Sequence, residues 1–434
     1  MAKTGAIVVG LMGLGVVGGG VARVLHEKRA AIAGHLGKDV VVKSVLVRDP
    51  SKSRNDAAPG LLITDNAQDL LDDPEIDVIV EVMGGEHPAL EYIQSAIRAG
   101  KHVVTANKEV MAKHGPEILT LAGENGISVR FEASVGGGIP IIGPLLQDLL
   151  ANDMTAVHAI INGTTNYILT SMAREGLGFD VALKNAQELG YAEADPANDI
   201  LGLDAAYKLA VLSTLAFHSK VHASEVYYEG IDKLAAEDFH YAAELGYVIK
   251  LLAIGWRNGD TIQARVHPAF LPVAHPLAKV DEVLNAVELQ GDLVGRVMFQ
   301  GPGAGDMPTT SAVIGDVLGI ARSIASGGRP SPPPRLDRDL VIQAMPEVET
   351  KYYLRLHAND KPGVMAQVTR VLGDHQVSLA SVIQKATLQA DGLAEIVITT
   401  HEAKESLVQD AVQRLSELDV VKEVCNLVRI EELA

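Results

Sequence analysis

The sequence predicts an α/β domain with a doubly wound parallel sheet, then an α+β domain, and finally a small βαββαβ domain. Strand-like and helix-like runs alternate up to residue 131, and longer helix-like runs follow from about residue 140. A proline-rich stretch, SGGRPSPPPR, precedes the last segment. The length of 434 residues suits about three domains of roughly 150 residues each.

The first domain, residues 1–135, is predicted from its alternating pattern. Short β-branched runs predict strands and amphipathic runs predict helices. Strands that alternate with helices form a parallel sheet covered on both faces, the Rossmann arrangement. The expected strands are 6–11, 41–47, 77–82, 102–105 and 127–131, and the expected helices are 16–33, 88–99 and 109–124.

The pattern of the second domain, residues 136–325, is α+β. Longer amphipathic runs predict helices, and AVHAIING and VIKLLAIGW read as strands between them. The expected helices are 139–151, 165–175, 180–189, 203–217 and 237–244.

A linker, placed at 326–348, is predicted by four prolines and two glycines in the ten residues that begin it. The last domain, residues 349–434, has the βαββαβ order of a ferredoxin-like fold. Its expected strands are 351–359, 378–386, 393–400 and 420–430, with helices at 363–375 and 403–418.

Charge and cysteine content exclude several classes of function. The formal charge is −18, from 37 Lys and Arg against 55 Asp and Glu, so nucleic acids and anionic membranes are poor partners. The single cysteine, Cys425, can form no internal disulfide and no cysteine-based metal site, which indicates a reducing cytoplasm and an inert buried thiol. No run reaches the about 18 apolar residues of a membrane span, and the glycines within residues 5–17 favour an ordered strand over a signal peptide.

A glycine-rich loop follows the first expected strand. Gly13, Gly15 and Gly18 have the spacing G-x-G-x-x-G. The first glycine allows a tight turn, the second lets a pyrophosphate approach the backbone, and the third lets the helix pack on the strand. The helix start, Val16 and Val17, would face the phosphates. A dinucleotide site is favoured over a purely structural turn.

The end of the second strand indicates which dinucleotide binds. VLVRDPSKSRN offers Arg48 first and then Asp49, with Lys52 and Arg54 behind. An arginine there receives the 2′-phosphate of NADP, whereas an acid holds the ribose of NAD. We expect NADP to be preferred and NAD to be tolerated. The alternative is that these charges only solvate a loop.

A lysine stands among carboxylates in the second domain. Asp204 and Lys208 are four residues apart on an expected helix and share one face. Because that helix is apolar on most sides, the pair is expected to be buried and suited to proton transfer. The alternative is a surface ion pair.

The loop before this helix is acidic. YAEADPANDI follows a probable helix cap at Gly190 and displays Glu193, Asp195 and Asp199. Such carboxylates could hold Mg²⁺ or Ca²⁺, or could bind the ammonium of an amino-acid substrate.

A second lysine, Lys108, opens a helix in VVTANKEVM. It lies at the carboxyl edge of the parallel sheet, where doubly wound folds bind ligands. A lysine at a helix N-terminus opposes the helix dipole, so a functional role is favoured over a structural one.

With these motifs described, the sequence resembles homoserine dehydrogenase over essentially its whole length, through GLGVVGGG, TANK, FEASVGGGIP, NGTTNYI, LGYAEADPANDILGLDAAYK and GPGAGDMPT. The resemblance implies reversible NAD(P)-linked oxidation of L-homoserine to L-aspartate 4-semialdehyde, on the route to threonine and methionine. It implies that Lys208 donates and accepts the proton, aided by Lys108. Glu193, Asp199 and Asp204 would bind the substrate and position the lysine.

Two further segments resemble parts of that family. FEASVGGGIP resembles its loop for a monovalent cation, Na⁺ or K⁺, although composition alone would also suit a hinge. The implied ligands are Glu132, Val135, Gly137 and Ile139. GPGAGDMPT, with Gly303 and Gly305, resembles the segment that covers the cofactor, so residues 303–325 would complete the first domain.

The last domain resembles an ACT domain, a regulatory module that commonly binds amino acids between paired copies. The expected ligand loop holds Asn359, Asp360, Gly363 and Val364. Threonine as an inhibitor and a homo-oligomer, dimer or tetramer, are the corresponding expectations. The alternative is a domain that serves only dimerisation.

Two other functions compete with this reading. One is another nicotinamide dehydrogenase with an ACT tail, such as 3-phosphoglycerate dehydrogenase, but the acidic loop would repel its anionic substrate. Moreover, His87, His158 and His218 stand singly, without an evident catalytic partner. The other is a non-enzymatic sensor of NADPH and amino acids, which has no use for paired lysines.

Overall fold

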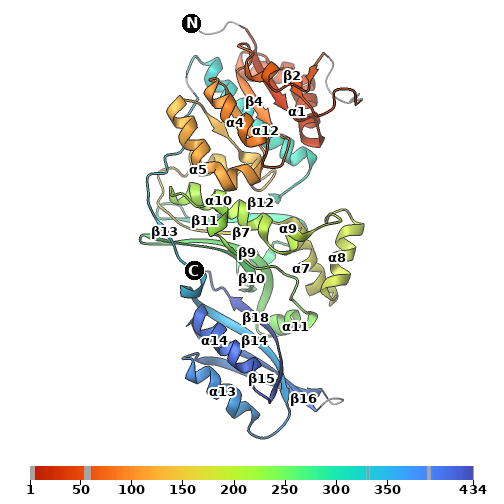
Figure 1. The fold of residues 1–434 in the computed structure, drawn as a ribbon, viewed down its shortest axis with the longest axis vertical. Helices are drawn as coiled ribbons and strands as arrows, with labels where there is room; N and C mark the ends of the chain where they lie inside the picture. Colours follow the sequence, from red (N-terminus) through yellow and green to blue (C-terminus); the bar gives the residue numbers. More distant parts are fainter. Residues whose placement is uncertain (1–4, 53–59, 329, 332, 389–391, 434) are drawn as a thin grey trace. The chain divides into compact units, whose positions relative to one another are not determined.

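The computed structural model describes residues 5–52, 60–328, 330–331, 333–388 and 392–433 (Figure 1). The chain forms two compact units. The first comprises Met1–Val157, Tyr207–Val226 and Leu284–Leu340, and the second comprises His158–Ala206, Tyr227–Val283 and Val341–Ala434. Two elements, β7 (Met154–Ile160) and α10 (Leu203–Phe217), pass from one unit into the other.

The first unit is built on a six-stranded sheet in the order β3-β2-β1-β4-β5-β6. All neighbouring strands are parallel, which confirms the doubly wound α/β fold. The strands are β1 (Ile7–Met12), β2 (Val40–Leu46), β3 (Leu62–Thr64), β4 (Val78–Glu81), β5 (His102–Thr105) and β6 (Val129–Arg130). Strand β3 was not predicted, because three residues are too few for a recognisable alternation.

Helices cover this sheet, and one of them returns from far along the chain. The helices are α1 (Val16–Glu27), α2 (Arg29–Leu36), α3 (Gln68–Leu71), α4 (Ala89–Arg98), α5 (Lys108–Asn125), α6 (Ile142–Leu146) and α12 (Asp306–Ala325). Helix α12 packs against α1 (Figure 1) and places Val313 and Val317 in the same core as Val21 and Leu25. The approach is close, since a side chain at Gly20 would clash with Thr310.

Two predicted helices of this unit were wrong in extent. The run expected at 16–33 is broken at Lys28, which leaves the helical conformation between α1 and α2; nothing in the local sequence explains this break. The helix expected at 139–151 shrinks to the five residues of α6. Gly143 and Pro144 lie inside that run, and both residues have poor helix propensity. A hairpin that was not predicted, β11 (Leu284–Gly291) with β12 (Gly295–Pro302), completes the unit.

Three helices of the second unit lie close to their predicted positions: α7 (Gly163–Glu175), α8 (Phe179–Glu188) and α11 (Ala236–Glu244). The short α9 (Ala197–Ile200) was not predicted, since its residues were expected to form a loop. Strand β9 (Tyr247–Asn258) pairs along its whole length with β10 (Thr261–Pro272), and β8 (Tyr227–Tyr228) also pairs with β10. Of the strands β8, β9 and β10, only β9 was predicted from the sequence.

The C-terminal segment has the predicted βαββαβ order. It consists of β14 (Glu349–Asn359), α13 (Val364–Asp374), β15 (Leu379–Leu388), β16 (Leu393–Thr400), α14 (Glu405–Ser416) and β18 (Val421–Ile430), with the two-residue β17 (Ala403–Lys404) before α14. The strand order β18-β14-β16-β15 is ferredoxin-like. In the stretch expected to be a linker, β13 (Val341–Ile342) pairs with β10 and a 3₁₀ turn follows at Met345–Glu347.

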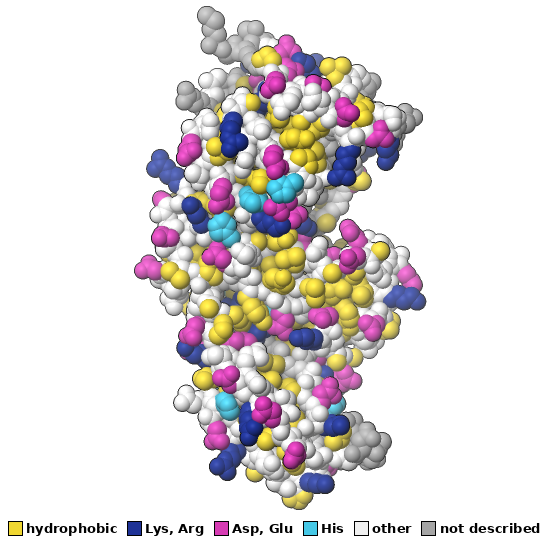
Figure 2. All heavy atoms as spheres, in the orientation of Figure 1, with side chains coloured by type: hydrophobic (Ala, Val, Ile, Leu, Met, Phe, Trp, Pro, Cys, Tyr) yellow, Lys and Arg dark blue, Asp and Glu magenta, His cyan; other side chains and the backbone are white. Residues whose placement is uncertain are grey.

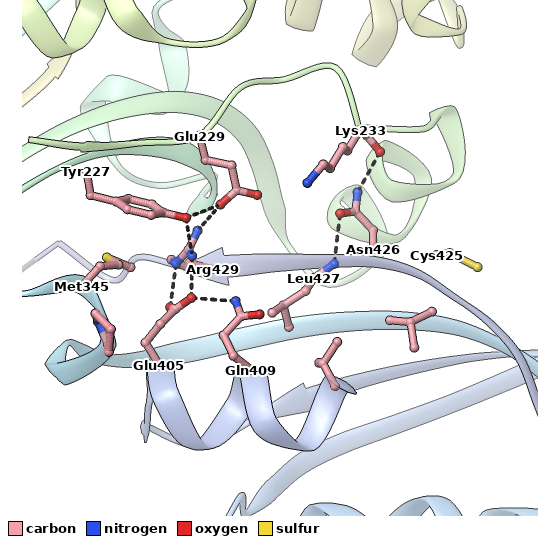
Figure 3. Close-up of a pocket in the computed structure, with 13 residues that line it drawn as sticks. Tyr227, Glu229, Lys233, Met345, Glu405, Gln409, Cys425, Asn426, Leu427 and Arg429 are labelled. Atoms are coloured by element: carbon pink, nitrogen blue, oxygen red, sulfur yellow. Dashed lines mark hydrogen bonds and ion pairs between the residues drawn. The ribbon is translucent and has the colours of Figure 1, made fainter. Parts of the chain in front are cut away.

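A buried arginine joins this segment to β8 within the second unit. Arg429 on β18 donates two hydrogen bonds to Glu405 on α14, at 2.8 and 2.6 Å, and one to Glu229 at 2.8 Å. Tyr352 donates a further bond to Glu405. Arg429, Glu405 and Glu229 border a cavity of about 640 Å³, and the arginine lies between the two carboxylates (Figure 3). The guanidinium is paired with two carboxylates of the protein itself, so its role is structural.

Figure 2 shows acidic and basic side chains interspersed on the face in view, without a large basic area. Among the described residues, no helix is long and apolar enough to cross a membrane.

The buried pair Arg265 and Glu431 gives the first testable prediction. Arg265 donates to both carboxylate oxygens of Glu431 at 3.1 Å, and both side chains are 7% exposed. Glu431→Gln leaves the guanidinium buried without its counter-charge, so we expect a loss of about 3–5 kcal/mol near neutral pH. The denaturation midpoint in urea measures this loss. Glu432→Gln, in an exposed pair with Lys351, is the control and should cost less than about 1 kcal/mol.

The same variant has a defined pH dependence. Burial raises the pKa of Glu431, but Arg265 and His267 together lower it by more than burial raises it. The pKa therefore falls from 4.5 to about 2. A depressed carboxyl pKa stabilises the fold above the unfolded value and loses this effect as the pH falls toward the folded value. The gap between wild type and Glu431→Gln should therefore narrow between pH 4.5 and pH 2. A constant gap across this window would contradict the assignment.

Candidate active site

The glycine loop between β1 and α1 has three different local environments. Gly13 has a φ of +102°, and a Cβ there would lie 2.8 Å from the carbonyl oxygen of Val82. Gly15 caps α1, and no protein atom lies within 4 Å of the place where its Cβ would be. A Cβ on Gly18 would clash with the carbonyl of Gly13. Gly13 thus makes the tight turn, Gly15 leaves space for a ligand, and Gly18 packs closely, as predicted for the three glycines.

The helix start at this loop is accessible. Val16 is 71% exposed, and Val17 follows it in the first turn of α1. The open side of Gly15 and the N–H groups of this turn form a surface that suits a phosphate.

The residues after β2 are exposed. Arg48 and Asp49 both lie on the surface. The carboxylate of Asp49 accepts hydrogen bonds from the N–H and hydroxyl of Ser51, at 2.9 and 2.6 Å. The Asp49 carboxylate is therefore used within its own turn. Arg54, the other predicted contact, lies outside the described residues.

A polar network lies at the carboxyl ends of β4 and β5. Glu81 accepts hydrogen bonds from the Thr105 hydroxyl at 2.6 Å and from the N–H of Met83 at 2.8 Å, and burial raises its pKa. Asn107 caps α5 through Val110 at 3.1 Å. Sequence reasoning missed Glu81 and Asn107, although polar residues that end buried strands were the available signal. The network fixes the start of α5, and with it the position of Lys108, the first residue of this helix.

Both predicted lysines line one cavity of about 300 Å³ in the first unit. Lys208 is only 9% exposed, as expected from its apolar helix. The other lining residues come from the ends of β4 and β5, from the loop after β6 and from the segment before α12. They are Gly84, Gly85, Ala106, Asn107, Glu109, Ala133, Ser134, Gly136, Gly137, Gly303, Ala304 and Thr309.

Two of the predicted carboxylates share one amide. The side-chain N–H₂ of Asn162 donates to Asp199 at 2.7 Å and to Asp204 at 2.9 Å, and its oxygen caps α7 through Thr165 at 2.8 Å. Asp204 is 4% exposed and lies four residues before Lys208 on α10. Asn162 was not singled out from the sequence, although an Asn before Gly-Thr-Thr is a helix-cap signal.

The other two acids of the loop are exposed. No hydrogen bond or ion pair within the described residues links the carboxylate of Glu193 to Asp199 or Asp204, and its backbone carbonyl accepts from Gln187 at 3.1 Å. Asp195 accepts from the N–H of Ala197 at 3.3 Å. Of the three acids in the loop, Asp199 is therefore held by Asn162, whereas Glu193 and Asp195 are exposed.

The side chain of Glu132 has a structural partner. Its carboxylate accepts three N–H groups, from Ile141 at 2.6 Å, Ile142 at 2.8 Å and Gly143 at 2.6 Å. Its own N–H donates to Asp316 at 2.8 Å. Burial raises the pKa of Asp316 to about 7. Only the backbone carbonyls of the 132–139 loop remain suited to a hard cation.

That loop also meets the segment before α12. Gly136 and Gly137 have φ values of +72° and +54°, and a Cβ on Gly137 would clash with the carbonyl of Gly303. Gly305, with a φ of +121°, caps α12. Among the predicted cation ligands, Val135 and Ile139 are buried.

The three histidines lie outside the lining of this cavity. His87 is exposed and contacts Glu91 at 2.6 Å. His158 is buried in β7, and His218 contacts the carbonyl of Arg335 at 3.3 Å. None has the geometry of a catalytic base for this site.

The predicted regulatory loop forms in the second unit. Asn359 ends β14 and donates its N–H to Val420 at 2.8 Å, while Asp360 donates its N–H to Gly392 at 3.0 Å. Gly363, with a φ of +90°, caps α13, and Val364 begins this helix. These four predicted residues lie in one strand-to-helix turn.

Comparison with known proteins covers the whole chain. Residues 140–318 match the homoserine dehydrogenase family, residues 13–132 match the NAD-binding domain of homoserine dehydrogenase, and residues 352–420 match the ACT domain. Homoserine dehydrogenase of Bacillus subtilis is 40% identical over 428 residues, 98% of each chain.

Solved structures agree. A homoserine dehydrogenase from Thiobacillus denitrificans superposes with a TM-score of 0.91 at 43% identity, over 99% of both chains. A hyperthermophilic archaeal homoserine dehydrogenase solved in complex with NADPH has a TM-score of 0.61 at 28% identity, over 72% of this chain and 97% of that one.

The glycine loop gives the second prediction. Gly15→Ala adds a methyl group to open space, so the fold should be unchanged while NADPH binding weakens on the order of tenfold, about 1.4 kcal/mol. Gly18→Ala should destabilise the fold by about 1–3 kcal/mol through its clash with Gly13. Fluorescence titration with NADPH and thermal unfolding separate the two effects.

The control is Gly19→Ala, which also has open space around it. Equal NADPH affinity in the Gly15 and Gly19 variants would contradict the phosphate site.

Proposed function

The chain belongs to the homoserine dehydrogenase family, and from this premise we propose that it catalyses the reversible NAD(P)-dependent oxidation of L-homoserine to L-aspartate 4-semialdehyde. This reaction would supply threonine and methionine biosynthesis, in the cytoplasm. The observation that carries the proposal is the cavity of about 300 Å³ that both Lys108 and Lys208 line. When bound at the glycine loop, the dinucleotide supplies the hydride acceptor for oxidation and the hydride donor for reduction.

Lys208 moves the proton in this proposal. In the oxidation, its neutral amine accepts the hydroxyl proton of the substrate as hydride leaves the carbon that bears this oxygen. In the reduction, its ammonium returns the proton to the oxygen. The burial of Lys208 supports this role, because few water molecules compete for the proton in such a place. Lys108 adds a second positive charge that stabilises the oxygen as negative charge develops on it.

Asp199 and Asp204 bind the substrate ammonium. Their shared contact with Asn162 supports this role, because the amide holds the two carboxylates close together, and carboxylates pair with an ammonium. Asp204 also lies one helical turn from Lys208 on α10, so it can orient the amine. Glu193 is the weakest member of this set, because it is exposed, and it would contact the ammonium only as the acidic loop adjusts.

NADP is the preferred cofactor in this proposal, and NAD is the alternative. The exposed Arg48 supports it, since a guanidinium binds the 2′-phosphate, whereas the carboxylate of Asp49 is held by Ser51. Arg54 would contribute from outside the described residues.

A monovalent cation, Na⁺ or K⁺, binds the 132–139 loop in this proposal. Its ligands would be backbone carbonyls of Glu132, Val135, Gly137 and Ile139, because the Glu132 carboxylate is engaged by three N–H groups. Oxygen donors suit such an ion. The cation would hold this loop against the cofactor-covering segment at Gly303.

The ACT domain is proposed to bind an amino-acid effector, threonine, at the turn formed by Asn359, Asp360, Gly363 and Val364. The exposed N-terminus of α13 and the acid beside it provide partners for a carboxylate and an ammonium. Such modules pair across copies, so a dimer or tetramer is part of this proposal.

The central prediction concerns Lys208. Lys208→Ala should lower kcat about 10²–10⁴-fold, since general acid-base catalysis contributes this much. The Kd for NADPH should stay within about twofold, because the glycine loop remains intact. Absorbance of the reduced nicotinamide with L-homoserine and NADP measures kcat, and fluorescence measures binding. Lys220→Ala, an exposed lysine after the same helix, is the control. A Lys208 variant with wild-type turnover would eliminate the proton-transfer role.

The nucleotide preference is tested at Arg48. Arg48→Ala should raise the KM for NADP by on the order of tenfold, about 1.4 kcal/mol, and leave the KM for NAD nearly unchanged. The neighbouring Lys52→Ala serves as a control for loss of positive charge in the same exposed loop. Equal loss with both nucleotides, or no loss, would remove Arg48 from the 2′-phosphate site.

A further inference from the structure

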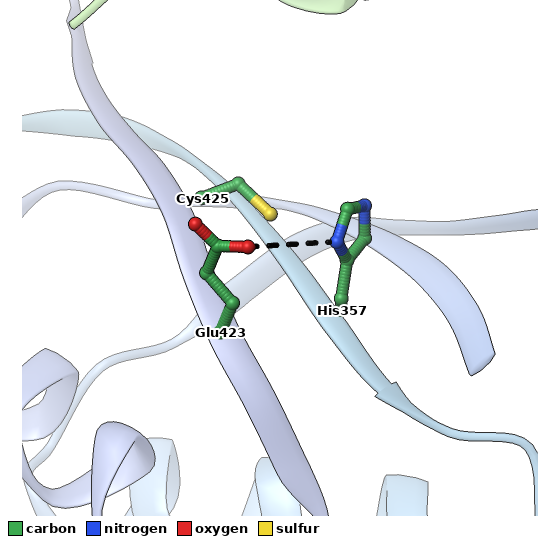
Figure 4. Close-up of side chains that lie close together, drawn as sticks. All are labelled: His357, Glu423 and Cys425. Carbon is green, nitrogen blue, oxygen red and sulfur yellow. Dashed lines mark ion pairs between the residues drawn. The ribbon is translucent and has the colours of Figure 1, made fainter. Parts of the chain in front are cut away.

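Three side chains with metal-binding groups meet on the ferredoxin-like sheet, away from the proposed active site. His357 lies on β14, and Glu423 and Cys425 lie on β18. The two strands are antiparallel, and His357 is directly opposite Glu423. Figure 4 shows the imidazole, the carboxylate and the thiol pointing toward one another.

Cys425 lies two residues after Glu423 on β18, and side chains two residues apart in a strand point to the same face. The pairing with β14 is irregular here: Arg355 pairs with Asn426 and Leu356 pairs with Val424, so Cys425 is an extra residue on β18 with no direct partner on β14. The thiol lies on the face that carries His357 and Glu423 (Figure 4).

The distances are close to those of a metal site. One ligand atom from each residue lies within 4.8 Å of the others, and Nδ1 of His357 is 3.9 Å from Oε2 of Glu423. Zinc bonds of about 2.0–2.3 Å place tetrahedral ligand atoms roughly 3.3–3.8 Å apart. The side chain of Glu423 is 65% exposed, so a rotamer change can close the remaining gap.

A second carboxylate orients the imidazole. Nε2 of His357 contacts Glu395 on β16 at 3.3 Å. This contact orients the ring, and Nδ1 faces Glu423, where it can act as a ligand. Glu395 is itself held by the Tyr241 hydroxyl at 2.8 Å and by Arg355 at 3.3 Å. Metal-ligating histidines in proteins have this same carboxylate support.

The charges around the group also favour a cation. Two carboxylates, Glu423 and Glu395, flank a single imidazole. Arg355 contacts Glu395 at 3.3 Å and the buried Asp238 at 2.7 Å, so its charge is shared between these two carboxylates.

We propose that His357, Glu423 and Cys425 form a zinc site, with nitrogen, oxygen and sulfur ligands and a fourth position for water. Binding replaces the thiol proton by a Zn–S bond and releases that proton to solvent. The metal would connect β14 to β18. Because β18 also pairs with β10 and carries Arg429, the zinc would brace the strand that anchors the regulatory domain.

Cobalt titration of the full-length protein tests the site. The chain is stripped with a chelator, no nucleotide is added, and Co²⁺ is followed by the thiolate-to-cobalt charge-transfer absorption. We expect this band to saturate at one Co²⁺ per chain and to vanish when Zn²⁺ displaces the cobalt. Cys425→Ser should abolish the band, and His357→Gln should weaken binding by about 10–100-fold. His401→Gln, an exposed histidine of the same domain, should bind as the wild type does.

A second readout follows the fold. Zn²⁺ should raise the melting temperature of the wild type and of His401→Gln, and leave that of Cys425→Ser unchanged. Absence of a thiolate band in the wild-type protein overturns the proposal without any variant. Undiminished Co²⁺ affinity in Cys425→Ser overturns it as well, because the ion would then be held elsewhere.

Discussion

The carboxyl ends of the parallel strands meet at one edge of the sheet. The active site of this protein depends on the hydrogen bonds that the polar groups at that edge make. Glu81 ends β4 with no exposure to solvent, and it keeps its hydrogen bonds through Thr105 and the following turn. A buried carboxylate without such partners would be costly. Because these contacts hold the start of α5, Lys108 opens that helix at the cavity rather than elsewhere.

Helix α10 adds the second requirement, an amine and a carboxylate on one apolar helix. Lys208 and Asp204 are both nearly buried, one turn apart. Asn162 links Asp204 to Asp199.

The fold was predictable wherever one local pattern ran long enough. Helices α7, α8, α10 and α11 begin and end within two residues of their predicted positions, because amphipathic periods of ten or more residues are distinctive. The errors lie where tertiary contacts decide. The run at 139–151 became the short α6, whose first N–H groups are held by Glu132. Strands β10 and β11 were missed because they are buried strands without clean alternation. The sequence did not show that the Glu132 side chain serves as a helix cap.

The sequence by itself determined the local chemistry: the three glycines and their separate roles, the acid and lysine four residues apart, and the βαββαβ order of the last domain. These follow from short-range geometry, which a few neighbouring residues specify. Only the tertiary structure decided which distant groups meet. Lys108 joins Lys208 in one cavity, Asn162 reaches Asp199 and Asp204, and Cys425, which the sequence suggested to be an inert thiol, lies beside His357. Strand register and helix packing bring these groups together, and both depend on the whole core rather than on any one segment.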